Sequence, residues 1–180
     1  MSERVTFGWE GFEEFDELLD QITMDFGVRD ARRILIRAVK QAMAPVLWDA
    51  KLAAPVDTGA LQASLQLEAR KPTNKDKRSK YVDQNDVVIS AVTTASGKKL
   101  AKKSFYNVKT GGKQTGIQSD ARAIAQEFGT ANIPAKPYLR PSLESNSVTV
   151  VGNLGDSLRD ELNKYKARKA KKLARALSKG

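Results

Sequence analysis

Two hydrophobic periodicities divide this chain of 180 residues and limit what it can fold into. Over residues 12–22 the apolar residues recur every three or four positions with acidic residues between them. This spacing predicts an amphipathic helix, which Gly27 is placed to end. Segment 30–52 repeats the spacing, but Pro45 lies inside it. Because a proline in a helix interior costs about 3 kcal/mol, we expect a kink near Gln41 or a break into two helices.

The middle of the chain changes to the alternation of apolar and polar residues that is typical of strands. Residues 65–69 alternate in this way, which predicts a half-buried strand, and residues 4–9 form a second, shorter candidate. The run 87–93 is the most β-prone of the chain, and we expect it to be the central strand of a sheet. Residues 119–128 then predict a short helix, and Gly129 follows where a helix end favours a left-handed backbone.

The C-terminal part of the chain predicts one long helix. Apolar residues keep a spacing of three to four within segment 141–177, and Pro141 suits the first turn of such a helix. Gly152 and Gly155 interrupt the pattern without shifting it, so they mark a weak point in the helix. The predicted class is therefore α+β: a small antiparallel sheet packed against N-terminal and central helices, with a long C-terminal helix.

Composition divides the chain into one domain and two basic segments. Residues 1–163 have the length of a single α+β domain. Within them, residues 96–118 hold six lysines and four glycines, which predicts a long mobile loop with a short strand at 104–108. From residue 164 to residue 180 there are eight basic residues and no acid, which predicts a basic helical extension.

Cysteine and histidine are both absent from the sequence. Their absence excludes disulfides, thiolate catalysis, proton transfer by imidazole, and the cysteine and histidine ligands of zinc. An enzyme with this composition would have to use carboxylates, lysine or tyrosine, and we expect no catalytic residue, no cofactor and no metal site. No apolar run reaches the 18 residues of a membrane-spanning helix, so no membrane contact is expected either.

Charge is distributed unevenly along the chain. The formal net charge is +10, but residues 1–30 hold nine acids against two arginines, a net of −7, which leaves +17 for the rest. Such polarity suits contact with nucleic acid or head-to-tail association of protein copies. The candidate residues for contact with DNA or a partner are Lys98, Lys99, Lys102, Lys103, Lys169, Lys171 and Lys172.

Residues 56–60, Val-Asp-Thr-Gly-Ala, match the active-site string of retroviral-type aspartic proteases. Such an enzyme needs two aspartates at the tips of strand-loops, where they share one proton. Here the string occurs once and follows a helical segment, and no apolar strand supplies a flap over a substrate. We therefore interpret Pro55 as the end of the preceding helix and Asp57 or Thr58 as the acceptor of backbone N–H groups from the next turn. Leu61 is then a core residue.

Two segments together resemble a known protein family. Residues 54–65, APVDTGALQASL, are followed by residues 127–143, EFGTANIPAKPYLRPSL. In this order the two motifs resemble the head–tail joining family of long-tailed, lambdoid-type bacteriophages, whose members are also called neck, minor tail or tail-completion proteins. The motif positions present here are Asp57, Thr58, Gly59, Leu61, Ser64, Glu127, Phe128, Gly129, Thr130, Pro134, Pro137, Tyr138, Leu139, Arg140 and Pro141.

The resemblance implies a structural protein of the virion and not an enzyme. Its place would be the neck, in a ring of copies around the DNA conduit, after assembly in the host cytoplasm. Its partners would be head-connector proteins on one side and tail-terminator or tail-tube proteins on the other. The alternative is a sequence-independent nucleic-acid-binding protein that uses the basic loop and the basic tail.

The proline-rich segment 134–141 carries a more detailed expectation. Three prolines restrict its backbone, so it can present Tyr138 and Leu139 at little ordering cost. We expect both to be buried against the sheet or a neighbouring subunit, and we interpret Phe128 as core or interface packing. Arg140 is expected to meet an acidic group, with Glu127 as the leading candidate within the chain.

Overall fold

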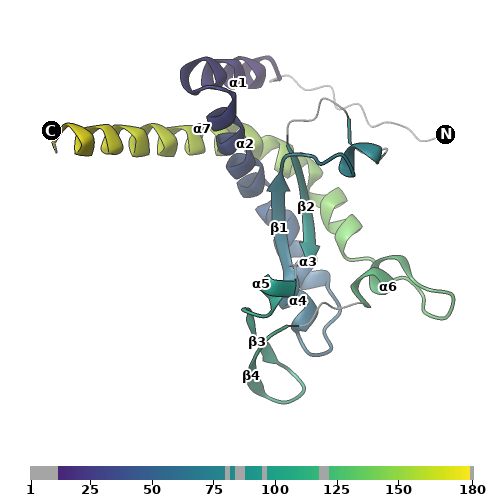
Figure 1. Cartoon of the computed structure of the whole chain (residues 1–180). Helices are drawn as coiled ribbons and strands as arrows, with labels where there is room; N and C mark the ends of the chain where they lie inside the picture. Colours follow the sequence, from purple (N-terminus) through teal and green to yellow (C-terminus); the bar gives the residue numbers. More distant parts are fainter. Residues whose placement is uncertain (1–11, 80–81, 84–87, 95–96, 118–121, 179–180) are drawn as a thin grey trace, which may run out of the picture.

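The computed structural model describes residues 12–79, 82–83, 88–94, 97–117 and 122–178. The strand expected at 4–9 and the helix cap expected at Ser119 lie outside these residues. The described elements are α1 (Phe12–Phe26), α2 (Val28–Ala42), α3 (Ala44–Ala53), α4 (Ala60–Ser64), β1 (Leu65–Arg70), a 3-10 helix (Asp76–Arg78), β2 (Ile89–Thr94), α5 (Gly97–Leu100), β3 (Ser104–Asn107), β4 (Gly112–Thr115), α6 (Arg122–Phe128) and α7 (Leu139–Leu177). The predicted α+β class is confirmed (Figure 1).

The break expected in segment 30–52 occurs at Met43, between α2 and α3. Met43 donates its backbone N–H to the carbonyls of Val39 and Gln41, and thereby closes α2. Pro45 lies in the first turn of α3, where a backbone N–H has no acceptor within the helix. The missing N–H of proline therefore costs no hydrogen bond there. The proline therefore starts a second helix instead of bending one long one.

The principal sheet pairs β1 with β2 in antiparallel register, from Leu65 opposite Thr94 to Arg70 opposite Ile89. The expectation of a central strand at 87–93 is wrong for the described residues, because β2 has one neighbour and the sheet has two strands. Its inner face rests on the helices: Leu67 packs with Met43 and Val46. Val92 of β2 packs in the same cluster, so β2 meets helices through this residue and does not lie between two strands.

Segment 97–117 holds more regular structure than the long loop with one short strand that the sequence predicts. It holds α5 and a hairpin of β3 and β4, and the strand expected at 104–108 is confirmed as β3. Leu100 and Ile117 are almost fully buried and pack with Phe105 and the α4 residue Ala63. Two buried residues at the two ends of the segment, too far apart to form a local pattern, hold it to the body.

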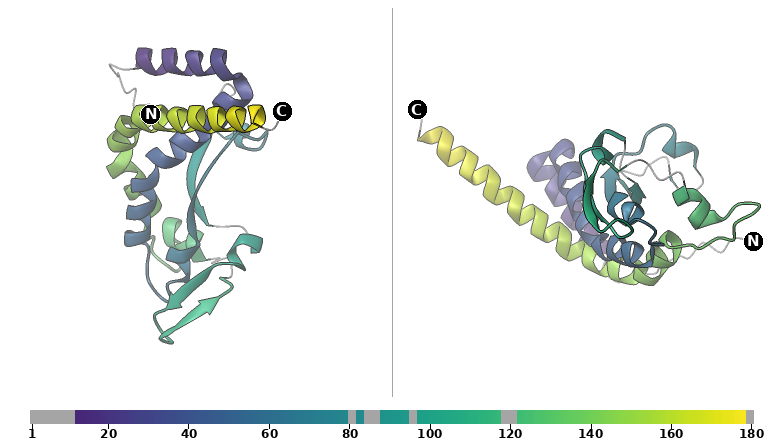
Figure 2. Two further views of the ribbon diagram at one scale, coloured as in Figure 1. Left: turned by 90° about the vertical axis from the view of Figure 1, so that its left-hand side faces the viewer. Right: turned by 90° about the horizontal axis from the view of Figure 1, so that it is seen from below.

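Helix α7 runs unbroken from Leu139 to Leu177, as the spacing of its apolar residues predicts. Figures 1 and 2 show that it changes direction between its green beginning and its yellow C-terminal half. Gly152 and Gly155 belong to the part of the helix before that half, and glycines are a common cause of helix bends.

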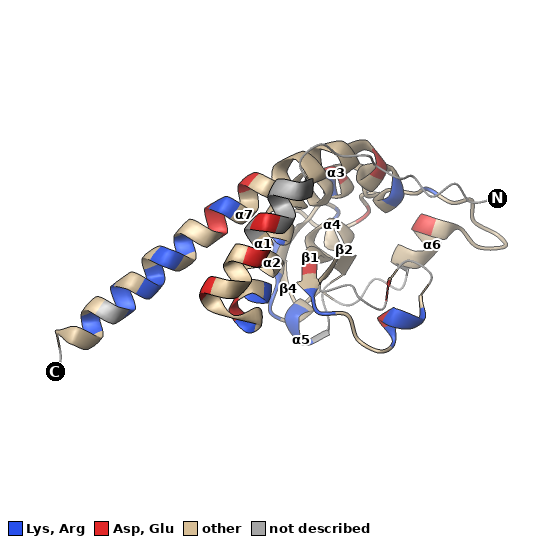
Figure 3. Ribbon diagram, turned by 90° about the horizontal axis from the view of Figure 1, so that it is seen from above, with Lys and Arg blue, Asp and Glu red and all other residues tan. Residues whose placement is uncertain are grey.

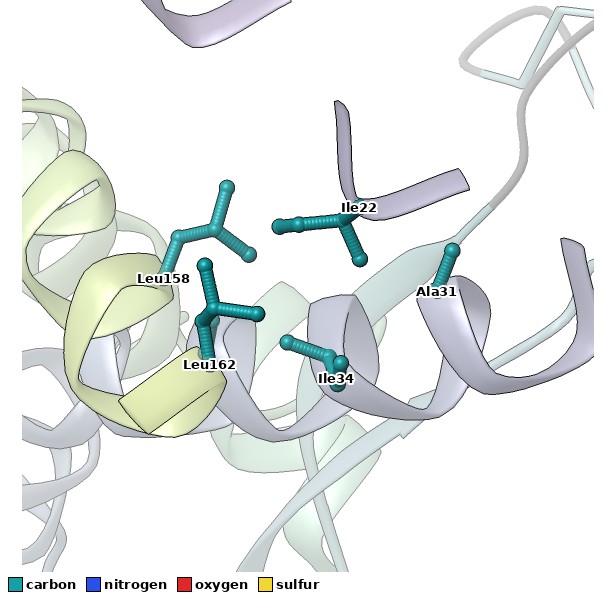
Figure 4. Packing of buried hydrophobic residues seen from close by; sticks show 6 residues of the cluster. Ile22, Ala31, Ile34, Leu158 and Leu162 are labelled. Carbon is teal, nitrogen blue, oxygen red and sulfur yellow. The ribbon is translucent and has the colours of Figure 1, made fainter. Parts of the chain in front are cut away.

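One core lies where α1, α2 and α7 meet (Figure 4). Ile22 of α1, Ile34 of α2 and Leu158 of α7 are each at most 1% exposed, and Ala31 and Leu162 complete the contact. Helices far apart in the sequence are therefore held together by aliphatic side chains. Within the described part of the chain, no helix is both long enough and apolar enough to cross a membrane.

Candidate functional site

The first motif forms the tight turn between α3 and α4. The hydroxyl of Thr58 accepts the backbone N–H of Ala60 at 3.3 Å, which confirms the interpretation in which Thr58 serves the next turn. Gly59 has a φ of 85°, a left-handed conformation that side-chain-bearing residues rarely adopt. The turn thus needs a small hydroxyl residue and a glycine for reasons of backbone geometry.

The same turn receives the β3–β4 hairpin, a role that the sequence analysis missed. The N–H of Val108 donates to the carbonyl of Thr58 at 3.3 Å, and Lys109 forms an ion pair with Asp57. A Cβ added to Gly59 would lie 3.0 Å from the carbonyl oxygen of Tyr106. The backbone of the motif and the backbone of the hairpin are therefore in direct contact, and any larger residue at Gly59 would separate them.

The second motif begins with a turn at Gly129, whose φ is 75°. A Cβ there would lie 2.9 Å from the nitrogen of Ala135 and 3.0 Å from the carbonyl oxygen of Ile133. The hydroxyl of Thr130 accepts the N–H of Ile133 at 3.1 Å, and the two residues also form an isolated β-bridge. This turn folds the proline-rich segment back toward α6.

Glu127 connects α6 to the beginning of α7. Its carboxylate accepts three consecutive backbone N–H groups, from Tyr138 at 2.8 Å, Leu139 at 2.9 Å and Arg140 at 3.1 Å. These groups belong to the first turn of a helix, which has no internal partners for them. The expected pair with Arg140 is present, with its Nε 3.4 Å from the carboxylate, but the three backbone bonds are shorter. Glu127 therefore acts as a helix cap supplied by the preceding helix, α6.

The electrostatics of Glu127 agree with this role. Burial alone would raise the pKa of the carboxyl, since the side chain is 3% exposed. The N–H groups of Leu139, Tyr138 and Arg140, together with the Arg140 side chain, outweigh burial and hold the pKa below its ordinary value. The carboxylate stays ionised at neutral pH, at the positive end of the α7 dipole.

The two motifs meet in one core cluster. Leu61 and Leu65 from the first motif pack with Tyr138 from the second, and with Ala123 of α6. The hydroxyl of Ser64 is buried and donates to the carbonyl of Leu61 at 2.7 Å. The expected burial of Tyr138 is confirmed, and Leu139 packs half-buried against the same cluster. Pairing of the motifs in the sequence therefore reflects a physical contact.

Phe128 differs from its expected place. It is 64% exposed, so its interpretation as a core residue is wrong, while an interface role stays a prediction. The guanidinium of Arg140 lies 5.0 Å from the centre of its ring, a cation–π contact. Pro137 and Pro141 are exposed as well.

An exposed apolar surface lies next to the first motif. We call it the hairpin groove; it lies between α3, α4 and the β3–β4 hairpin, and its apolar walls include Trp48, Leu52, Tyr106 and Val108. Trp48 and Leu52 are each 66% exposed, and Tyr106 is 65% exposed. Large apolar side chains gathered in this way on a small protein are typical of protein–protein contact sites.

The candidate lysines fall into two separate groups (Figure 3). Lys98, Lys99 and Lys102 are exposed on and just after α5. Lys103 is half-buried and donates to the carbonyl of Ala63 at 3.0 Å; burial and the nearby Lys51 lower its pKa. Lys103 is therefore committed to a bond within the chain.

The second group lies on α7. Lys169 stands over the ring of Phe26, with Nζ 4.9 Å from the ring centre. Lys171 and Lys172 are exposed further along the helix. The two groups of lysines lie on separate surfaces, since α5 and the end of α7 lie apart in both views of Figure 2.

Among the described residues, no three carboxylates gather closely enough to hold a metal ion. The polar groups of both motifs are engaged in backbone bonds and ion pairs that shape the chain. What these motifs build is a scaffold: one turn that holds a hairpin and one carboxylate that holds a long helix.

The family model described as "Bacteriophage HK97-gp10, putative tail-component" matches residues 16–154, a range that includes both motifs, the hairpin and the first part of α7. The chain belongs to this family. It is accordingly a structural component related to bacteriophage tails and a part of the virion, as the resemblance implied. Searches of curated proteins and of solved structures gave no match.

Proposed function

We propose that this phage tail component acts in the neck, where it joins the head connector to the tail or completes the tail end. The hairpin groove carries the proposal, because Trp48, Leu52 and Tyr106 form an apolar surface that a partner protein would cover. Aromatic residues in such a position contribute much of the binding energy of protein interfaces. The partners would be other copies of the chain and the neighbouring connector, tail-terminator or tail-tube proteins.

A ring of copies around the DNA conduit is part of this proposal. The molecule is polar in shape and charge: α1 lies at one end and the β3–β4 hairpin at the other (Figure 1). A heterologous interface between two different ends of one molecule generates a ring when the rotation between copies closes.

The test is made in phage particles. Deletion of the gene should give heads without tails or tails with abnormal ends in electron micrographs, and the unaltered gene supplied in trans should restore complete particles. Complete, infectious particles formed without the chain would overturn the proposal.

A surface variant tests the groove itself. Trp48→Glu should leave the thermal unfolding of the purified chain unchanged, since the side chain is exposed, but should fail to restore tails. Val148→Glu on α7 is the matched control, because Val148 is 70% exposed and lies outside the groove. Normal tails with Trp48→Glu would exclude the groove as an essential contact.

Sequence-independent contact with nucleic acid is the second candidate function. The observation that favours it is the exposed lysine group of Lys98, Lys99 and Lys102. Such contact would weaken steeply with salt, with a slope set by the number of phosphates engaged. Filter binding of a random-sequence DNA duplex at several salt concentrations measures this slope, which Lys98→Glu, Lys99→Glu and Lys102→Glu together should flatten.

A further inference from the structure

The last turns of α7 leave the body of the molecule (Figure 2). Helix α7 contacts α1 through Tyr165 and Lys169, which both meet Phe26 at the end of α1. Residues 170–177, here called the arm, continue past that point, and every described side chain of the arm is exposed. A helix that extends without support from its own fold gains little stability by itself, because most helical stability in proteins comes from packing.

The arm carries its positive charge on one side. Lys171, Lys172 and Arg175 occupy helix positions i, i+1 and i+4, which lie within an arc of roughly 100°. Two earlier cations of α7 have an acidic neighbour: Lys164 and Arg168 lie 3.2 and 3.8 Å from Glu161. Within the described part of the chain, the three arm cations have no ion-pair partner, and Figure 3 shows no red on the ribbon beside them.

Helix α1 carries the complementary charge. Its sequence contains six acids and no basic residue. Glu17 and Asp20 are exposed, and their spacing of three residues places them on one helix face. The apolar residues Leu19, Ile22 and Phe26 occupy a different face, which packs against α2 and α7. A row of like charges is unfavourable by itself, so each row gains from an opposite one.

The two rows of one copy cannot meet. Tyr165 and Lys169 fix α7 at Phe26, the last residue of α1, and the arm runs on beyond that end (Figures 1 and 2). Asp20 precedes Phe26 by six residues, which at 1.5 Å per residue is about 9 Å back along α1. The cations of the arm and the acids of its own α1 are thus on opposite sides of the anchoring contact.

We infer that the arm of one copy binds the acidic face of α1 in the next copy, through Lys171, Lys172 and Arg175 against Glu17 and Asp20. This inference rests on the proposed assembly of copies and specifies one of its contacts. The contact is heterologous, since it joins two different surfaces, and opposite charges at such a contact fix order and orientation. High salt weakens it, because all five groups are exposed.

Charge reversal in the full-length chain tests the inference. One variant reverses the arm (Lys171→Glu, Lys172→Glu and Arg175→Glu), and another reverses α1 (Glu17→Lys and Asp20→Lys). Sedimentation velocity at low salt should show that the unaltered chain associates with itself. In each variant alone, the association constant should fall by about tenfold or more. A one-to-one mixture of the two variants should associate again, because each arm then meets an α1 face of opposite charge.

Lys98→Glu, Lys99→Glu and Lys102→Glu together form the matched control, since they change the net charge as much as the arm variant does. These residues are exposed at a different place on the molecule, so the control should associate as the unaltered chain does. Circular dichroism of every variant should show the same helix content, because no reversed side chain is buried.

Three results would overturn the inference: an unaltered chain that stays monomeric at low salt, variants that associate normally, or a mixture that does not recover. If the arm variant instead loses only its binding to a random-sequence DNA duplex, the arm is a phosphate contact and the assignment to α1 is wrong. The neck role is judged separately, by whether the same variants restore tails in particles, so the failure of one proposal can be told from the failure of the other.

Discussion

Glu127 shows how a single buried charge can organise a chain. A carboxylate at 3% exposure would be unfavourable without partners, but Glu127 has three backbone N–H groups and a guanidinium around it. Its position two residues before Gly129 places it on α6, while the groups that it binds open α7. Removal of the carboxylate would leave buried N–H groups without acceptors, which is more costly than loss of a bond at the surface.

Glu127→Gln should lower the free energy of unfolding by about 1–3 kcal/mol, because the amide offers one uncharged acceptor where the carboxylate offers two charged ones. Urea unfolding monitored by circular dichroism measures the change. Glu144→Gln is the control, since Glu144 is exposed on α7, and it should change stability by less than about 0.5 kcal/mol. Equal effects of the two substitutions would contradict the capping role.

The stability difference between Glu127→Gln and the unaltered chain should depend on pH. The pKa of Glu127 is lower in the folded chain than in the unfolded chain, so its contribution is fully present above the ordinary glutamate pKa of about 4.3. It is lost as the pH falls through the folded pKa, where the carboxyl takes up a proton. Unfolding curves at several pH values should therefore show the two proteins converging in acid, and a constant difference would exclude this mechanism.

Substitution by alanine should change the stability of the chain in opposite directions at Gly129 and at Gly152. Gly129→Ala forces a Cβ to 2.9 Å from a backbone nitrogen at a φ of 75°, and we expect a loss of about 1–3 kcal/mol. Gly152 lies inside α7 with nothing within 4 Å of the added Cβ, so Gly152→Ala should stabilise the chain by about 0.5–1 kcal/mol. Thermal unfolding compares both, and a stabilised Gly129→Ala variant would show that this turn is not needed.

At the scale of elements, segment 97–117 packs on the rest of the chain through a small cluster of its own. Leu100→Ala should loosen α5 and the hairpin without unfolding the α1–α2–α7 core, since Leu100 packs in a separate small cluster. Limited trypsin digestion should then cut faster after Lys98, Lys99 and Lys102. Val108→Ala, at an exposed residue of the same segment, should leave the cutting rate unchanged. Equally faster cutting in this variant would show that the cutting rate does not report the burial of Leu100.

The elements that sequence periodicity predicted are those whose pattern is local. Apolar residues recur every few positions in helices α1, α2, α3 and α7 and in strand β1, and the break at Met43 follows from one proline. The hairpin was missed because its burial depends on Leu100 and Ile117, which meet only in three dimensions. The contacts of Glu127 were predicted only in part for the same reason. The sequence indicated its pair with Arg140, but the three backbone hydrogen bonds depend on how α6 and α7 meet.

At the scale of the whole molecule, α7 is the element that connects the parts. Its first turn is held by Glu127 and its middle packs on α1 and α2. The domain boundary expected at 163–164 coincides with no end of this helix, which continues to Leu177. Tyr165, just past that boundary, donates to Asp30 at 2.6 Å and meets the ring of Phe26 at 5.0 Å, and it lowers the pKa of Asp30.

Two truncations locate the end of the folded domain. A chain that ends at residue 163 loses the Tyr165–Asp30 bond, the ring contact with Phe26 and the cation of Lys169, which are each of the order of 0.5–1.5 kcal/mol. We expect it to unfold at lower urea concentration than the full chain, by about 1–3 kcal/mol in the free energy of unfolding. A chain that ends at residue 170 keeps all three contacts and should match the full chain within about 0.5 kcal/mol. Tyr165→Phe in the full chain isolates the hydrogen bond, since the ring stays in place. Equal stability of the two truncated chains would support the boundary expected at residue 163, because the contacts of Tyr165 and Lys169 would then add nothing to the fold.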